Sequence, residues 1–281
     1  MEIASTSLPE GVGEPVDMVT GFRVNTPDEQ ILRNINSSIR RQLPQFNMYP
    51  DQPGTICIVG GGWSLDDTKD ELLDICWRQG APIIALNGAA KWLMERNIRP
   101  AIQMILDARS DNADFITDIP GCKYLISSQC APETFDACKG ETYIFHASGE
   151  ESKETLDSYY KGHWVNVIGG STVGMRSISL ARMMGFRFMH LFGFDSCYRD
   201  GRHHAYPQKL NEAEGSGRMY WALTNGDKSA GREFRCSTWQ ASQAQNFRDF
   251  LAANGKHFRL HIHGDGLLAY MLKTGAELAG D

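Results

Sequence analysis

The sequence predicts an α/β fold: a Rossmann-like, mostly parallel, doubly wound sheet with helices on both faces and an inserted lid. From Thr55 onward, short runs rich in β-branched residues alternate with amphipathic segments of helical length. This alternation is typical of parallel strands joined by crossover helices. Two predicted strands run into glycine-rich turns, and polar side chains follow several others. Because doubly wound sheets bind ligands at the carboxyl ends of their strands, the site is expected there.

The predicted elements fill the chain from residue 54 onward. Strands are predicted at residues 55–59, 83–86, 102–106, 124–127, 142–145, 165–168, 188–192 and 257–262. Helices are predicted at residues 66–79, 88–97, 131–138, 151–160, 172–184, 238–254 and 265–275. Residues 1–53 are polar and contain several prolines, so they are predicted to form an N-terminal arm with one helix, between residues 28 and 43. Residues 54–281 form the predicted nucleotide-binding catalytic domain, and residues 197–236, which lack periodicity, form its lid.

Composition narrows the class of protein. With 281 residues, 42% of them hydrophobic, the chain can bury a substantial core. Its net charge of −6 argues against a protein that coats nucleic acid, although basic residues outnumber acidic ones between Arg199 and Arg259. Seven cysteines without a Cys-x-x-Cys pair indicate reduced thiols in a cytoplasmic protein, not a zinc site or a disulfide framework. No apolar run approaches the roughly 20 residues of a membrane span.

The first glycine-rich turn, Gly60 to Ser64, follows the strand at residues 55–59 and precedes a predicted helix. Glycines let the backbone approach a phosphate or ribose closely, and a helix N-terminus offers free N–H groups to an anion. Ser64 and Asp67 also resemble a capping box. The turn is therefore either a nucleotide-binding loop or a tight strand–helix corner without a ligand.

Single polar residues follow the next strands. Asn87 could bond a base, ribose or phosphate, or it could cap the helix that follows. Asp107 could bind a ribose hydroxyl or a divalent cation, or it could cap a helix or pair with Arg109. Asp195, which follows the strand at residues 188–192, is a candidate ribose or metal ligand.

A second glycine-rich turn, Gly169-Gly170-Ser171-Thr172, precedes the helix predicted at residues 172–184. It places hydroxyl groups at a helix N-terminus, as the first turn does. Two such turns in one sheet are more informative than one, because both suit an anionic ligand that lies across adjacent strand ends.

Histidines occur in two pairs that could carry chemistry. His203 and His204 lie in the predicted lid, where either could be a general base or acid, or the two could form a solvated pair. His261 and His263 would face the same side of a strand, which is a geometry that can chelate a metal. Ordinary edge-strand histidines are the commoner interpretation of that second pair.

In order along the chain, these motifs resemble the MptE-like superfamily, which includes archaeal 6-hydroxymethylpterin diphosphokinases and motility-accessory-factor flagellin glycosyltransferases. They are similar, more distantly, to bacterial sialyltransferases that use CMP-sugars. The resemblance covers roughly residues 54 to 207 and rests on residues 59–65, 86–88, 106–107, 169–174 and 190–195. The family commonly has proline before the serine of the first turn. Trp63 stands there in this chain, where it could stack on a base or sugar or simply pack.

The resemblance implies roles for residues. It places at the nucleotide Gly60, Gly62, Ser64, Asn87, Gly170, Ser171 and Thr172. The analysis of turns and strand ends adds Gly61, Trp63, Asp107 and Gly169 to the expected nucleotide-binding residues. Because a lid histidine is the base in the sialyltransferases, either His203 or His204 is expected to be the base here, and Asp195, which follows a predicted strand, is the third expected catalytic residue.

The favoured function is a glycosyltransferase whose donor is a CMP- or UDP-linked sugar. The alternative enzyme is a pyrophosphokinase that uses ATP and Mg²⁺, with Asp107 and Asp195 as metal ligands. A third hypothesis is a nucleotide-binding module without catalytic activity. The acceptor could be a glycan, a protein, a small molecule such as a pterin, or a nucleic acid, and a homo-oligomer is compatible with the sequence.

Overall fold

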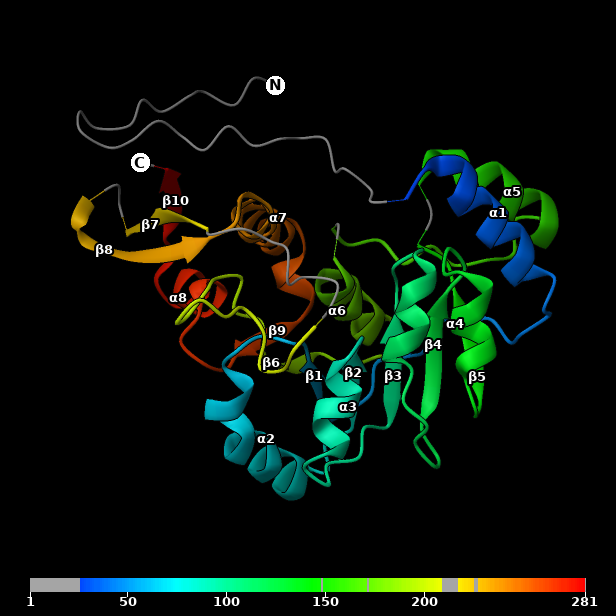
Figure 1. The fold of residues 1–281 in the computed structure, drawn as a ribbon, viewed down its shortest axis with the longest axis horizontal. Helices are drawn as coiled ribbons and strands as arrows, with labels where there is room; N and C mark the ends of the chain where they lie inside the picture. Colours follow the sequence, from blue (N-terminus) through cyan, green and yellow to red (C-terminus); the bar gives the residue numbers. More distant parts are fainter. Residues whose placement is uncertain (1–25, 148, 171, 209–216, 225–226, 281) are drawn as a thin grey trace.

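A parallel sheet forms the centre of the protein (Figure 1). The computed structural model describes residues 26–147, 149–170, 172–208, 217–224 and 227–280. The strands are β1 (Thr55–Val59), β2 (Ile83–Leu86), β3 (Ile102–Ile105), β4 (Lys123–Ser127), β5 (Thr142–Phe145), β6 (Phe188–Phe192) and β9 (Arg259–Ile262). Their order is β5-β4-β3-β2-β1-β6-β9, and every neighbouring pair is parallel. The predicted fold class is confirmed.

The direction of strand addition reverses at β1. Strands β2 to β5 follow one another on one side of β1, whereas β6 and β9 lie on its other side. The connections leaving β1 and β6 therefore depart to opposite sides, and a ligand crevice forms at such a reversal. The carboxyl ends of β1 and β6 are the place where the fold itself favours a site.

Burial on both faces explains why residues 56–59 of β1 are all apolar. Cys57 and Val59 pack beneath α2 (Leu65–Gln79) and α3 (Ala89–Met94), and all of these elements contribute to one core cluster. Ile56 and Ile58 point the other way, toward α6 (Val173–Met183), which packs against β1, β2 and β3. Because successive strand residues face opposite sides, only a run of apolar residues satisfies both layers.

The described part of the predicted N-terminal arm joins the core. Helix α1 (Asp28–Ile39) packs against α4 (Pro132–Ala137) and α5 (Glu150–Tyr160). The Asn34 side chain, which is 1% exposed, donates hydrogen bonds of 2.9 Å to the carbonyls of Ala108 and Gln129. These bonds tie α1 to the loops that follow β3 and β4.

Most predicted elements are confirmed, but residues 165–168 are not a strand. They form one isolated parallel bridge, between Asn166 and His146, and the turn at Gly169 follows at once. The apolar run there packs Val167 into the core without extending the ladder beyond β5. A short apolar run cannot by itself distinguish a strand from a buried extended loop.

The second half of the predicted lid is regular structure. Strands β7 (Arg218–Thr224) and β8 (Asp227–Cys236) form an antiparallel pair, and β10 (Glu277–Gly280) adds to β7. Figure 1 shows this small sheet at one end of the molecule and α1 with α5 at the other. The remaining helices are α7 (Thr238–Asn254) and α8 (Leu267–Thr274), with short 3₁₀ turns η1 (Ser110–Phe115) and η3 (Gly255–His257). Among the helices of the described ranges, none has the length and apolar character to cross a membrane.

Candidate active site at the carboxyl ends of β1, β2 and β6

Backbone hydrogen bonds hold the first glycine-rich turn against the carboxyl end of β6. The Gly60 N–H donates to the Phe192 carbonyl at 2.8 Å, and the Gly62 N–H donates to the Gly193 carbonyl at 2.9 Å. A Cβ placed on Gly62 would lie 2.2 Å from Asp195 Oδ2, so only glycine fits at this position. The glycines therefore serve the packing of two strand ends against each other, which is a structural role.

Asp195 lies at the centre of this packing and is 3% exposed. Its Oδ2 accepts the Ser64 N–H at 2.9 Å, and its carbonyl accepts the Leu267 N–H at 2.9 Å. One residue thus joins the carboxyl ends of β1, β6 and β9. Burial raises the pKa of the Asp195 carboxyl to about 6, and the hydrogen bond from Ser64 opposes this rise.

The predicted capping box at Ser64 does not form. Ser64 has helical backbone angles and its side chain makes no cap hydrogen bond. Its N–H, which the Asp67 side chain would accept in a capping box, donates to Asp195 instead. Asp67 pairs instead with Arg199, whose Nη1 lies 2.5 Å from Asp67 Oδ2. The start of α2 is therefore held by two tertiary contacts, not by a local cap.

Trp63 is buried, with 5% of its surface exposed. Its indole N–H donates to the Cys197 carbonyl at 3.0 Å, and the Arg199 guanidinium lies 3.9 Å from its ring centroid. These contacts fasten the first residues of the lid to the first glycine turn. Of the two roles expected for Trp63, the structure displays packing.

The lid crosses directly over the glycine turn. The Ala205 N–H donates to the Gly61 carbonyl at 3.0 Å, and Gly62 forms a β-bridge with His204. A Cβ on Gly61 would lie 2.8 Å from the His204 ring and 2.9 Å from the Tyr206 hydroxyl. The lid is closed on this turn, so a ligand that contacts Gly61 requires the segment around Tyr206 to move.

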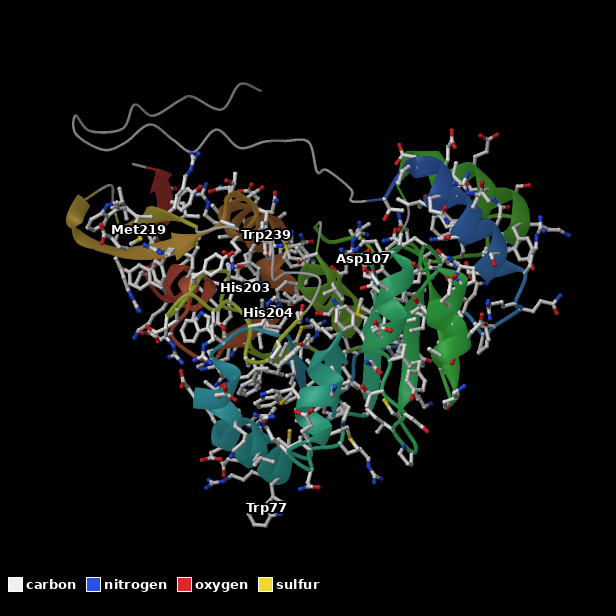
Figure 2. The ribbon with its side chains drawn as sticks, in the orientation of Figure 1. Trp77, Asp107, His203, His204, Met219 and Trp239 are labelled. Carbon is white, nitrogen blue, oxygen red and sulfur yellow. The ribbon has the colours of Figure 1, made fainter. Side chains whose placement is uncertain are left out.

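The two lid histidines differ in environment. Figure 2 shows the two residues next to each other, and their rings meet edge to face with centroids 4.1 Å apart. Burial and the neighbouring His203 lower the pKa of His204 to about 3, so His204 is neutral and a weak base in this closed arrangement. Burial also lowers the pKa of His203, whose ring lies edge to face with Tyr198 at 5.1 Å and with Trp239 at 6.4 Å.

Asn87 follows β2 in the left-handed conformation, with φ of 48°. Its backbone is fixed, because its N–H donates to Met104 and its carbonyl accepts from the Gln103 side chain. Its side-chain Oδ1 is buried, and none of the residues that the structure describes gives it a hydrogen bond. A buried acceptor without a donor calls for an explanation, and a bound ligand is one that the strand-end position suggests.

Asp107 forms a local ion pair. The Arg109 Nη2 lies 3.1 Å from Asp107 Oδ2, and the Arg109 N–H donates to Oδ1 at 3.1 Å. Strand β3 is three positions from β6, which corresponds to roughly 14 Å between the strands that precede Asp107 and Asp195. The structure therefore does not bring these two carboxylates together as ligands of one ion.

The second glycine turn adjoins the first through one aromatic ring. A Cβ on Gly174, at the start of α6, would lie 2.9 Å from Phe194, and a Cβ on Gly60 would lie 3.4 Å from the same ring. Gly169 and Gly170 have φ of 128° and 55°, angles that favour glycine. Ser171 lies outside the described residues. The Thr172 hydroxyl accepts the Met175 N–H at 3.2 Å, which makes it the cap of α6.

Two residues near the site were not predicted. Arg176 folds back from α6 so that its Nε donates to the Gly170 carbonyl at 2.9 Å, and burial lowers its pKa. Tyr206 packs over the turn that follows β1 and also over the turn that follows β2, since a Cβ on Gly88 would lie 3.0 Å from its ring. Arg176 lies one turn after the start of α6, so its position close to the second glycine turn could have been predicted from the sequence. Nothing in the local sequence indicates the position of Tyr206.

Comparison with known proteins agrees with the fold. Residues 29–201 match the model of a family described as 6-hydroxymethylpterin diphosphokinase MptE-like. A solved structure of the MAf glycosyltransferase from Magnetospirillum magneticum AMB-1 superposes with a TM-score of 0.61 at 17% sequence identity. That match covers 85% of this chain but only 36% of the glycosyltransferase, and it shows a shared fold. No curated protein matches the sequence significantly.

The buried Asp195 predicts a specific pH dependence of stability. Because its folded pKa of about 6 lies above the ordinary value of 3.8, the native state loses stability as pH rises through this interval. In Asp195→Asn the amide oxygen can still accept the Ser64 N–H, but no charge is buried. We expect the free energy of unfolding of the wild type to fall by about 1–2 kcal/mol relative to Asp195→Asn between pH 5 and 7.5.

Denaturant titration of both proteins at each pH measures this difference. The exposed Asp114 provides the control, since Asp114→Asn should leave the difference from wild type constant over the same interval. A constant difference for Asp195→Asn as well would contradict the burial of an ionisable carboxyl at this junction.

Proposed function

Because the chain belongs to the 6-hydroxymethylpterin diphosphokinase MptE-like family, we propose that it is a transferase that takes its group from a bound nucleotide, and that the donor is a nucleotide-activated sugar. Asn87 is the observation on which this proposal chiefly rests. Its buried amide oxygen receives no hydrogen bond from the described part of the chain and is held in a left-handed backbone at the end of β2, so it is suited to accept from a base amino group or a ribose hydroxyl.

The neighbouring elements supply what the rest of a nucleotide needs. The helix N-termini of α2 and α6 both face the carboxyl ends of the central strands, and Phe194 links their turns. Partial positive charge at a helix N-terminus favours a phosphate. In this proposal the nucleoside lies at Asn87 and its phosphate lies toward the glycine turns, beneath the lid.

The proposed reaction is an in-line displacement at the anomeric carbon of the sugar. The bond between that carbon and the donor phosphate breaks, and its electron pair leaves with the phosphate, which the helix dipoles stabilise. The acceptor oxygen forms the new bond, and a lid histidine takes its proton. We assign this role to His203, because burial and the neighbouring His203 lower the pKa of His204 to about 3, which makes the His204 ring a weak proton acceptor.

A pyrophosphokinase that uses ATP and Mg²⁺ is the second candidate, and the description of the matching family favours it. Its metal would need carboxylates that converge on one point. Asp107 is paired with Arg109, Asp195 is buried beneath Gly62, and their strands are three positions apart. The two carboxylates therefore do not converge on a shared Mg²⁺ ion. This supports a nucleotide donor that binds without a metal ion held by Asp107 and Asp195.

A titration with CMP, UMP and ATP, each with and without Mg²⁺, tests the donor class. We expect a pyrimidine nucleotide to raise the melting temperature without Mg²⁺. Asn87→Gly should weaken that binding by about tenfold, because one hydrogen bond from the ligand is lost. Asn97→Gly is the matched control, since Asn97 is also an asparagine with positive φ, 58°, and it is exposed at the end of α3.

Tight, magnesium-dependent binding of ATP with none of CMP or UMP would contradict the glycosyltransferase proposal and support the pyrophosphokinase. Equal affinities of Asn87→Gly and Asn97→Gly for the nucleotide would remove Asn87 from the site. Nucleotide binding without turnover on any donor panel would favour a binding module.

The base assignment is tested by kinetics once a donor and acceptor are found. His203→Ala should lower kcat by about 10²- to 10⁴-fold. The control is His257→Ala, which changes an exposed histidine outside the lid and should leave kcat unchanged. Because burial lowers the pKa of His203, its base form persists at neutral pH. We therefore expect the acidic limb of kcat/KM to have its midpoint below pH 6.5. Wild-type turnover by His203→Ala would eliminate this residue as the base.

A further inference from the structure

A second cluster of ionisable side chains lies on the face of the sheet covered by α2. It consists of Glu71 on α2, His190 on β6, His261 on β9 and His263 directly after β9. The parallel register places His190 opposite His261, and the His263 N–H donates to the Leu191 carbonyl at 2.9 Å, which continues the ladder. Because residues two apart in a strand share a face, the three histidines meet below α2.

Three of these side chains have ligand atoms close together. One oxygen of Glu71 and one ring nitrogen each of His261 and His263 all lie within 4.8 Å of one another. His263 Nδ1 is 2.9 Å from Glu71 Oε2. Ligand atoms around a tetrahedral zinc ion, with bonds of about 2.0–2.1 Å, lie about 3.3 Å apart. Small rotations of the exposed Glu71 and His261 side chains would bring the set to this spacing.

The buried member of the set is held in one orientation. The His263 ring, 3% exposed, stacks on Phe192 with centroids 4.1 Å apart and planes at 6°. Its Nε2 lies 2.7 Å from His190 Nδ1. If His263 donates its Nε2 proton to His190, its Nδ1 carries the lone pair and faces Glu71. Metal-binding histidines commonly donate the other ring N–H in this way, which fixes both tautomer and orientation.

We propose that Glu71, His261 and His263 bind one divalent transition-metal ion of the zinc class, and that His190 positions His263. Imidazole nitrogens with one carboxylate suit Zn²⁺, Co²⁺ or Ni²⁺, whereas Mg²⁺ prefers oxygen ligands. The exposed Glu71 and His261 leave a path for the ion from solvent.

The ion would fasten α2 to the edge strand β9 close to the candidate active site. His263 directly precedes Gly264, where a Cβ would lie 2.6 Å from the Ser64 Cβ. The bound metal would therefore brace the segment that supports Ser64 and Asp195. Its role in this proposal is structural, and it does not depend on which nucleotide the protein takes.

Titration of the full chain with ZnCl₂ tests the site. The chain is prepared without an affinity tag and freed of metal by a chelator, and binding is followed by calorimetry and by melting temperature. We expect one Zn²⁺ per chain and a higher melting temperature, with no comparable effect of MgCl₂. His261→Ala and Glu71→Gln should each weaken zinc binding at least about tenfold and abolish the rise in melting temperature.

Matched controls lie next to the cluster. His257→Ala changes an exposed histidine just before β9, and Asp70→Asn changes an exposed carboxylate next to Glu71 on α2, so both variants should bind zinc as the wild type does. His261 and Glu71 are themselves exposed, so their variants are expected to fold, which circular dichroism verifies. Absence of saturable one-to-one binding by the wild type would overturn the proposal. Wild-type zinc affinity in both His261→Ala and Glu71→Gln would overturn it equally.

Discussion

The burial of one carboxyl group, that of Asp195, is the constraint on which the candidate site depends. The Asp195 carboxyl accepts the Ser64 N–H and the Asp195 backbone carbonyl accepts the Leu267 N–H, so this residue joins three strand ends that are far apart in the sequence. Glycine is required at position 62 because this carboxyl fills the space that a side chain would need. An ionisable group in such a place costs stability at neutral pH, which is why its pKa rises. The buried Asp195 carboxyl thus determines the shape of the glycine turn that would face the ligand.

The lid and the glycine turn are parts of the same construction. Trp63 and Asp67 both contact the start of the lid, through Cys197 and Arg199, so the turn determines where the lid begins. The lid in turn covers Gly61 with His204 and Tyr206. Opening the site therefore does not require the Trp63 anchor to break, because the covering residues lie several positions further along the chain.

Much of this could be predicted from sequence because the signals are local. Strand–helix alternation and the glycine turns identified the sheet and the ends of β1, β2 and β6. The structural role of Asp195 could not be predicted, since its partner Ser64 is 131 residues away in the sequence. The residues around Asp195 are equally compatible with a ligand-binding carboxylate and with a buried one. The pairing of Asp107 with Arg109 was foreseen as one alternative. The β7–β8 hairpin was missed, although its strands are consecutive, because residues 197–236 lack the periodicity that predicts a strand.

Hydrogen exchange with and without nucleotide tests the central claim most directly, namely that a nucleotide binds at the carboxyl ends of β1, β2 and β6. The account predicts that the nucleotide that raises the melting temperature will slow exchange in peptides covering residues 60–66, 85–90 and 193–206. Peptides covering 97–101 and 119–123, at the opposite ends of the strands, should exchange at unchanged rates. Protection confined to other segments, with residues 60–66 and 85–90 unaffected by a bound nucleotide, would contradict the account.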